Sequence, residues 1–157
     1  MTCADYKVSS NNHIKRKLLN ILIVDDDIET AENFKTILEF RGHNIKIVDD
    51  GLRCITRCMD KEQKYDIVFL DYHMEGLDGA KVAQIVKTHN PSTLIFAYTG
   101  DNSEEAINEF RLAKMAGVII KPMNIKNIEL LISKIEVGET LNNNLFSRRG
   151  HKSVIIF

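Results

Sequence analysis

The sequence has little of what marks disordered or membrane-spanning proteins. Only two of its 157 residues are proline and eight are glycine, which argues against long disordered stretches. No apolar run approaches the ~20 residues that a membrane-spanning helix needs, and the first residues lack the apolar segment of a signal peptide. We therefore expect a soluble cytoplasmic protein without membrane insertion.

Charge and cysteine content are equally uninformative about partners. The 21 basic and 22 acidic residues give a formal net charge of −1, so bulk charge offers no argument for nucleic acid or membrane binding. The three cysteines are an odd number, which does not suit a disulfide framework. Cys54 and Cys58 are four residues apart on a predicted helix, and we interpret both as reduced packing side chains. We interpret four scattered histidines as surface residues: His13, His43, His89 and His151.

Strand and helix signals alternate through most of the chain. Aliphatic runs that predict buried strands lie at about 21–26, 45–48, 66–71, 93–98 and 117–120. Helical periodicity follows each of them, at about 28–38, 52–59, 80–88, from 103 onward and 124–136. Repeated βα units predict an α/β fold, a doubly wound five-stranded parallel sheet of the flavodoxin-like (βα)5 type, with strand order 2-1-3-4-5.

The chain divides into three predicted parts. Residues 1–18 are polar and then basic, which indicates a flexible N-terminal arm. Residues 19–137 carry the βα pattern, and residues 138–157 form a C-terminal tail without its own domain. The last four residues, 154–157, are apolar and strand-like. Three roles fit them equally well: covering the sheet edge, covering a helix, or docking on a partner.

Polar residues end four of the predicted strands. Asp25 and Asp26 close the first strand, Asp71 closes the third, and Thr99 and Lys121 end the fourth and fifth. In the predicted order these positions meet at the carboxyl edge of the sheet, where ligands bind in open α/β folds. Carboxylates suit Mg²⁺, one carboxylate can accept a phosphoryl group, and an ammonium can bind phosphate. Turn preference explains a single strand-end Asp or Thr, but not the whole set.

These residues stand in motifs that closely resemble the receiver domain of two-component response regulators. The matching motifs are Ile23-Val24-Asp25-Asp26-Asp27, the segment 70–79, Tyr98-Thr99-Gly100 and Lys121-Pro122. The resemblance covers about residues 19–137 and keeps the order and spacing of the family. It implies a phosphoprotein of two-component or phosphorelay signalling.

The resemblance also implies roles for single residues. Asp71 would be the phosphoacceptor. Asp25 and Asp26 would bind Mg²⁺, together with Asp71 and the backbone carbonyl of His73. Thr99 would be the switch hydroxyl, and Lys121 would pair with the phosphate and be joined to the next residue by a cis bond.

The partners implied by the resemblance are proteins. The phosphoryl group would come from a histidine kinase or a histidine phosphotransfer protein. Output would pass to a downstream protein through the face of the fourth helix, fifth strand and fifth helix, without direct contact to nucleic acid. A homodimer is left open. Such a protein is not an enzyme for other substrates, because it catalyses only its own phosphorylation and dephosphorylation.

The sequence departs from the family pattern at several positions. Val118 stands where the family usually has an aromatic residue coupled to Thr99, so we expect switching to depend more on Thr99 and the adjoining loop. Glu75 and Leu77 replace a Pro and a Met of the loop after the phosphoacceptor, which predicts a more mobile loop and extra negative charge near the metal. His73 stands at a position that influences hydrolytic water, and either orients it or is merely solvated.

Other interpretations remain open at this point. A pseudo-receiver would work only by protein contact; the lost aromatic favours it and the full acid–Thr–Lys set opposes it. A haloacid-dehalogenase-like phosphatase uses similar groups, but its Asp-x-Asp-x-Thr/Val motif fails at Glu29. A receiver excised from a longer hybrid kinase is the third alternative, since no output domain is seen in the sequence.

Overall fold

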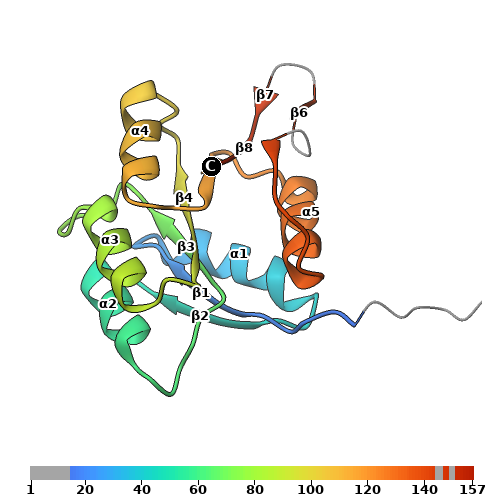
Figure 1. Cartoon of the computed structure of the whole chain (residues 1–157), viewed down its shortest axis with the longest axis horizontal. Coiled ribbons are helices and arrows are strands. Elements are labelled where there is room, and N and C mark those ends of the chain that lie inside the picture. The colour runs from blue at the N-terminus through green and yellow to red at the C-terminus, as the bar shows by residue number, and fades with distance from the viewer. Residues whose placement is uncertain (1–14, 144–146, 149–150) are drawn as a thin grey trace, which may run out of the picture.

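A six-stranded β-sheet runs through the computed structural model, which describes residues 15–143, 147–148 and 151–157 (Figure 1). The strands of this sheet are β1 Asn20–Val24, β2 Asn44–Val48, β3 Ile67–Asp71, β4 Leu94–Thr99, β5 Gly117–Ile120 and β8 Val154–Ile156. The parallel strands follow the order β2-β1-β3-β4-β5, which confirms the predicted topology. The sheet has one strand more than expected, because β8 pairs antiparallel with β5.

The helices of the described residues cover both faces of the sheet. They are α1 Ile28–Glu39, α2 Gly51–Met59, α3 Gly79–His89, α4 Glu104–Leu112 and α5 Ile125–Glu136. One face packs against α1 and α5, and the other against α2, α3 and α4 (Figure 1). A short separate ribbon pairs β6 (Ser147–Arg148) with β7 (His151–Lys152).

Alternation along each strand builds the two halves of the core. Ile21 and Ile23 point to the α1 and α5 side, whereas Leu22 and Val24 point to the α2, α3 and α4 side. Because successive side chains of a strand point to opposite faces, both sets are buried only when helices cover both faces. This explains why the strands read as continuous aliphatic runs.

Each of these helices begins with a polar N-cap whose side chain accepts a backbone N–H of the first turn. The N-caps are Asp27, Asp50, Asp78, Ser103 and Asn124. A cap of this kind stabilises a helix by about 1 kcal/mol. It also sets the residue at which the helix starts, so the loops at the carboxyl edge of the sheet have defined lengths.

A buried ionic cluster lies at the opposite, amino edge of the sheet. Glu136, at the end of α5, is only 4% exposed. The Nε and Nη2 atoms of Arg41 donate to its carboxylate at 3.1 and 2.9 Å, and Nε2 of His43 lies 2.8 Å away. Because the Leu19 N–H donates to Nδ1 of His43 at 3.2 Å, the ring proton is on Nε2. His43 is therefore buried and not a surface residue, contrary to our interpretation of the sequence.

Two opposing effects act on the pKa of Glu136. Burial raises it, while the hydrogen bonds and charge of Arg41, followed by the hydrogen bond from His43, lower it by more. The net pKa is below the ordinary value of 4.5. The ionised carboxylate is thus stabilised in the folded state relative to the unfolded state.

Most of the predicted N-terminal arm, residues 1–14, lies outside the described residues. Lys17 is described and forms an ion pair with Asp66. The division into an arm, a domain of residues 19–137 and a tail stays a prediction. In the part of the chain that the structure describes, no helix combines the length and apolar character needed to cross a membrane.

We expect Glu136→Gln to lower the free energy of unfolding at pH 7 by about 2 kcal/mol, because the partly buried Arg41 loses its charged partner. The pKa of Glu136 is depressed on folding, so this stabilisation is present above pH 4.5 and is lost as the pH falls through the folded-state value. Urea unfolding at pH 7 and at about pH 3.5 measures both effects.

The exposed Glu62→Gln is the matched control and should change the stability by less than about 0.5 kcal/mol. Equal stability of wild type and Glu136→Gln at pH 7 would contradict the assigned role of the cluster.

Candidate functional site

The sheet brings together the polar residues that end its strands. Val24 pairs with Leu70 in the β1–β3 ladder, so Asp25, the next residue, lies beside Asp71 at the end of β3. Asp71 pairs with Tyr98 in the β3–β4 ladder. Parallel pairing thus collects residues that are far apart in the sequence at one edge of the sheet.

Three carboxylates converge at this edge. One oxygen of each of Asp25, Asp26 and Asp71 lies within 4.8 Å of the others. Asp25 and Asp71 are buried and Asp26 is exposed. The Asp27 N–H donates to Oδ1 of Asp25 at 2.9 Å. The other carboxylate oxygen of Asp25, Oδ2, is buried without a hydrogen-bond partner, and among the described side chains it is the only buried polar atom of this kind.

This geometry fits a divalent cation. A buried carboxylate oxygen without a partner costs free energy, and a second buried carboxylate beside it adds repulsion. An oxygen-binding cation relieves both costs, and two or three carboxylates are a donor set that Mg²⁺ accepts. The residues present at this edge are therefore suited to hold it.

The pKa of Asp25 reflects the same crowding. Burial raises it most, the hydrogen bond from the Asp27 N–H lowers it, and the neighbouring charge of Asp71 raises it again. The result is a pKa of about 6 instead of 3.8. Without a cation, the ionised form of Asp25 therefore destabilises the folded state at neutral pH.

Lys121 supplies the positive charge of the site. Its Nζ lies 3.3 Å from Oδ1 of Asp71, which also accepts the His73 N–H at 3.2 Å. The ammonium lies 4.4 Å from the centroid of the Tyr98 ring, a distance at which cation and ring attract each other. The peptide bond from Lys121 to Pro122 is cis, as the resemblance implied.

Thr99 is fully buried at the end of β4. Its Oγ1 accepts the Asp101 N–H at 3.0 Å, and its carbonyl accepts the Lys121 N–H at 2.8 Å. The residue therefore sits next to both the loop that precedes α4 and the lysine whose ammonium contacts Asp71.

Tyr72 connects the site to α4, and the sequence offered no indication of this contact. Its hydroxyl donates to the carboxylate of Glu109, which raises the pKa of Tyr72 to about 12. Its ring packs edge-on against Phe110, with centroids 4.8 Å apart. Glu109 and Phe110 lie far along the chain, so only an aromatic residue after a strand-end Asp was visible in the sequence. Val118 is fully buried in the same half of the core.

The loop after β3 is largely exposed. His73, Glu75 and Leu77 all present their side chains to solvent. His73 contacts Asp71 through its backbone N–H, and its ring lies edge-on to Tyr72. The roles predicted for these side chains, and for the His73 carbonyl as a metal ligand, stay predictions.

Comparison with known protein families identifies this arrangement. The family described as "Response regulator receiver domain" matches residues 21–133. The chain belongs to this family. The match confirms the resemblance seen in the sequence, and the receiver domain accounts for the sheet, the covering helices and the acidic edge.

Curated relatives match this chain over part of their longer sequences. The chain is 27% identical over 116 residues to the transcriptional regulatory protein ZraR of Klebsiella oxytoca, covering 74% of this chain and 26% of that protein. It is 26% identical over 125 residues to the transcription factor SKN7 of Candida albicans, covering 80% and 22%. A sensor histidine kinase, AruS of Pseudomonas aeruginosa, is 24% identical over 121 residues, covering 74% and 12%. The chain thus spans about a quarter or less of the length of these relatives.

Solved structures share the fold. A CheY-like receiver domain protein from Methanospirillum hungatei superimposes with a TM-score of 0.71 at 24% identity, covering 76% of this chain and 94% of that chain. The receiver domain of the sensor histidine kinase PA1611 from Pseudomonas aeruginosa gives a TM-score of 0.68 at 19% identity, covering 78% and 100%. That second structure has a magnesium ion coordinated in its active-site cleft.

We expect Asp25→Asn to raise the free energy of unfolding at pH 7 by about 1 to 3 kcal/mol when no divalent cation is present. The pKa of Asp25 is raised on folding, so the wild type loses stability as the pH rises from 3.8 to about 6, and the amide does not. Urea unfolding in the presence of a chelator measures this difference.

Adding Mg²⁺ should reverse the order, because the wild type gains a bound cation and Asp25→Asn gains less. The exposed Asp49→Asn serves as control and should respond to Mg²⁺ as the wild type does. A wild type that is no less stable than Asp25→Asn without cation would contradict this account of the acidic edge.

Proposed function

We propose that this receiver domain accepts a phosphoryl group on Asp71 and that the modification switches its contacts with other proteins. The observation that carries the proposal is the convergence on Asp71 of a lysine ammonium at 3.3 Å and of two further carboxylates, one with an unpartnered buried oxygen. A carboxylate held between an ammonium and a cation-binding pair is suited to receive a phosphoryl group.

The donor in this proposal is a phosphohistidine of a histidine kinase or a histidine phosphotransfer protein. A carboxylate oxygen of Asp71 forms the new O–P bond as the P–N bond to the imidazole breaks. The electron pair of the broken bond stays on the imidazole nitrogen. Lys121 binds a phosphoryl oxygen and offsets the charge that develops in the transition state.

Asp25, Asp26 and Asp71, with the His73 carbonyl, would hold Mg²⁺. When bound, the cation supplies Lewis-acid stabilisation of the phosphoryl oxygens and reduces their repulsion from Asp71. Asp25 and Asp71 are buried, so these two ligands are already desolvated and held by the sheet. The proposed chemistry is confined to the domain's own phosphorylation and dephosphorylation, and the protein is not an enzyme for other substrates.

Thr99 is the switch in this proposal. Its Oγ1 accepts the Asp101 N–H in the present arrangement. Once Asp71 carries a phosphoryl group, the Thr99 hydroxyl has a new charged acceptor nearby and turns toward it. The Asp101 N–H then loses its partner, and the loop before α4 changes conformation.

The proposed output is a protein contact made in the cytoplasm through the face of α4, β5 and α5. Two observations support a path from Asp71 to α4: the Thr99–Asp101 hydrogen bond and the contact of Tyr72 with Glu109. Val118, which lacks an aromatic ring, adds no such path. The pseudo-receiver alternative receives no support from the site, because the acids, the hydroxyl and the ammonium converge.

We expect incubation with acetyl phosphate and Mg²⁺ to add one phosphoryl group to the wild type and none to Asp71→Asn, as measured by intact mass. The exposed Asp49→Asn is the matched control and should be labelled like the wild type. Rapid self-hydrolysis would hide the adduct, so beryllofluoride binding, which needs no covalent bond, is measured in parallel. Absence of both the adduct and Mg²⁺-dependent beryllofluoride binding would contradict the proposal.

We expect the backbone amide of Asp101 to exchange at least about tenfold faster with deuterium after beryllofluoride binding, because breaking a hydrogen bond of about 1.4 kcal/mol changes an equilibrium tenfold. Thr99→Val, which keeps the shape and lacks the hydroxyl, should exchange fast in both states. Thr99→Ser keeps the hydroxyl and should respond like the wild type. A beryllofluoride response of Thr99→Val equal to that of the wild type would rule out the hydroxyl as the switch.

A further inference from the structure

The chain's own C-terminal segment lies on the face between α4 and α5. β8 pairs antiparallel with β5, and in Figure 1 it lies between α4 and α5. We call this place the strand-docking groove; it is defined by the edge of β5 that pairs with β8 and by the residues of α4 and α5 that contact the segment. Arg111 of α4 stacks on the ring of Phe157, 5.1 Å from its centroid. Asn127 of α5 donates to the hydroxyl of Ser153. Both helices therefore contact the segment.

Backbone pairing fixes the segment in one register. The Ile120 N–H donates to the carbonyl of Ser153 at 2.8 Å, and the Phe157 N–H donates to the carbonyl of Ala116 at 3.0 Å. These bonds lie at the two ends of the antiparallel ladder between β5 and β8. The edge of β5 is thus used as a template for an added strand.

Gly117 makes this close approach of two backbones feasible. A Cβ atom at this position would lie 2.3 Å from the carbonyl oxygen of Ile155, much closer than non-bonded atoms come. A glycine inside a strand often marks such a close approach. Any side chain at position 117 would keep β8 away from β5. Because this residue is glycine, the two backbones can approach each other here.

The side chains of the segment enter both halves of the core. Val154 and Ile156 pack with the α1 and α5 half, and Ile155 and Phe157 pack against the α2, α3 and α4 half. Val154 is 1% and Ile156 6% exposed. The groove thus selects an extended segment in which several consecutive residues are apolar.

The far edge of β8 is bonded as well. The side-chain amide of Asn143 donates to the carbonyl of Ile156 at 2.8 Å and accepts the Ile156 N–H at 2.7 Å. One side chain therefore satisfies both polar groups that Ile156 directs away from β5. Asn143 holds the segment from outside while β5 holds it from inside.

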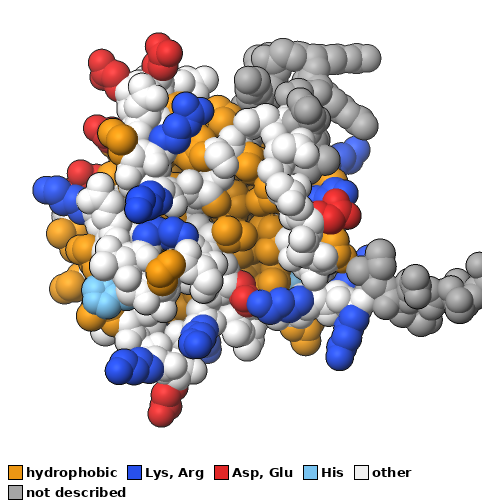
Figure 2. Space-filling view, viewed as in Figure 1, with side chains coloured by type: hydrophobic (Ala, Val, Ile, Leu, Met, Phe, Trp, Pro, Cys, Tyr) orange, Lys and Arg blue, Asp and Glu red, His pale blue; other side chains and the backbone are white. Residues whose placement is uncertain are grey.

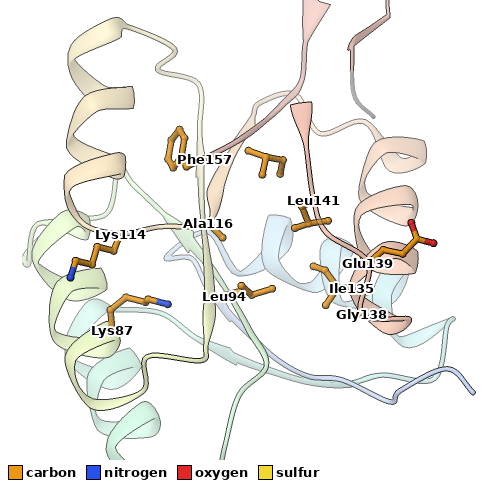
Figure 3. A pocket seen from close by; sticks show the side chains of 10 residues that line it. Lys87, Leu94, Lys114, Ala116, Ile135, Gly138, Glu139, Leu141 and Phe157 are labelled. Atoms are coloured by element: carbon orange, nitrogen blue, oxygen red, sulfur yellow. The ribbon is translucent and has the colours of Figure 1, made fainter. Parts of the chain in front are cut away.

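A pocket of about 460 Å³ borders the segment (Figure 3). Ile156 and Phe157 line one side of it, and Leu94, Ile135 and Leu141 contribute further apolar surface. Figure 2 shows hydrophobic side chains at the surface in the hollow between the helices. A competing segment that also filled this pocket would bury more apolar surface than β8 does.

We propose that the strand-docking groove is a binding site for an extended apolar segment, and that its resident occupant is the chain's own residues 153–157 in cis. A partner that uses the edge of β5 has to displace this segment and replace its backbone bonds. The assignment of this face to output rests on the proposed function, whereas the docking of the strand does not.

The test uses the full chain and a fluorescein-labelled peptide with the sequence of residues 151–157. Ile156→Asp places a charge where the apolar residue is buried, so the chain's own segment no longer docks and the groove is open. We expect this variant to bind the peptide at least about tenfold more tightly than the wild type, by fluorescence anisotropy without phosphodonor or Mg²⁺. Ile125→Asp, an equal change at an exposed site of α5, is the matched control and should behave like the wild type.

Adding Gly117→Val to Ile156→Asp closes the edge of β5 and should abolish peptide binding. Equal binding by wild type and Ile156→Asp, or no binding by a folded Ile156→Asp chain, would overturn the proposal. So would a wild-type dimer in sedimentation that Ile156→Asp converts to a monomer, because the occupant would then come from a second copy. Phosphorylation of Asp71 in the same variants reports separately on the proposed function.

One measurement needs no variant. Hydrogen exchange of the wild type should show the amides of Ile120 and Phe157 protected at least about a hundredfold relative to unstructured peptide. Exchange of both amides at the rate of an unstructured peptide would overturn the docking of the segment. This result tests the docking of a strand on β5 even where Ile156→Asp does not fold, and sedimentation of the wild type separates the chain's own segment from that of a second copy.

Discussion

Two buried carboxylates side by side are the constraint on which the site depends. The register of β1 against β3 places Asp25 next to Asp71, and burial raises the pKa of Asp25 and so the cost of charging it. The sheet holds them together because the apolar faces of its strands are covered by helices on both sides. The free energy of core burial therefore holds the two carboxylates together although they repel each other. Lys121 offsets part of this repulsion, and a bound cation would offset more.

The same edge is connected to a distant surface by contacts on neighbouring strands. Thr99 reaches the loop before α4 through Asp101, and Tyr72 reaches α4 through Glu109. The segment that contains β8 lies against α4 as well, through Arg111. A change at the acidic edge and a change in the occupancy of the strand-docking groove thus act on the same helix, which allows each to bias the other.

The amino edge of the sheet differs from the carboxyl edge in its charges. Glu136 joins the end of α5 to Arg41 and His43, so the amino edge is closed by compensated charges. At the carboxyl edge three carboxylates face the single ammonium of Lys121, and one oxygen of Asp25 has no partner. Polar groups without partners and shifted pKa values are typical of functional sites, and here they lie at the carboxyl edge of the sheet.

The sequence by itself determined the order of the strands and the residues at their ends. Aliphatic runs and helical periodicity are local patterns, and the strand-end residues Asp25, Asp71 and Lys121 could be read directly from them. Only the tertiary structure decided the burial of His43 and the contact between Tyr72 and α4, because their partners are far away in the chain. It also decided among the three roles open to residues 154–157, since pairing with β5 requires the close backbone approach at Gly117, which no local pattern specifies.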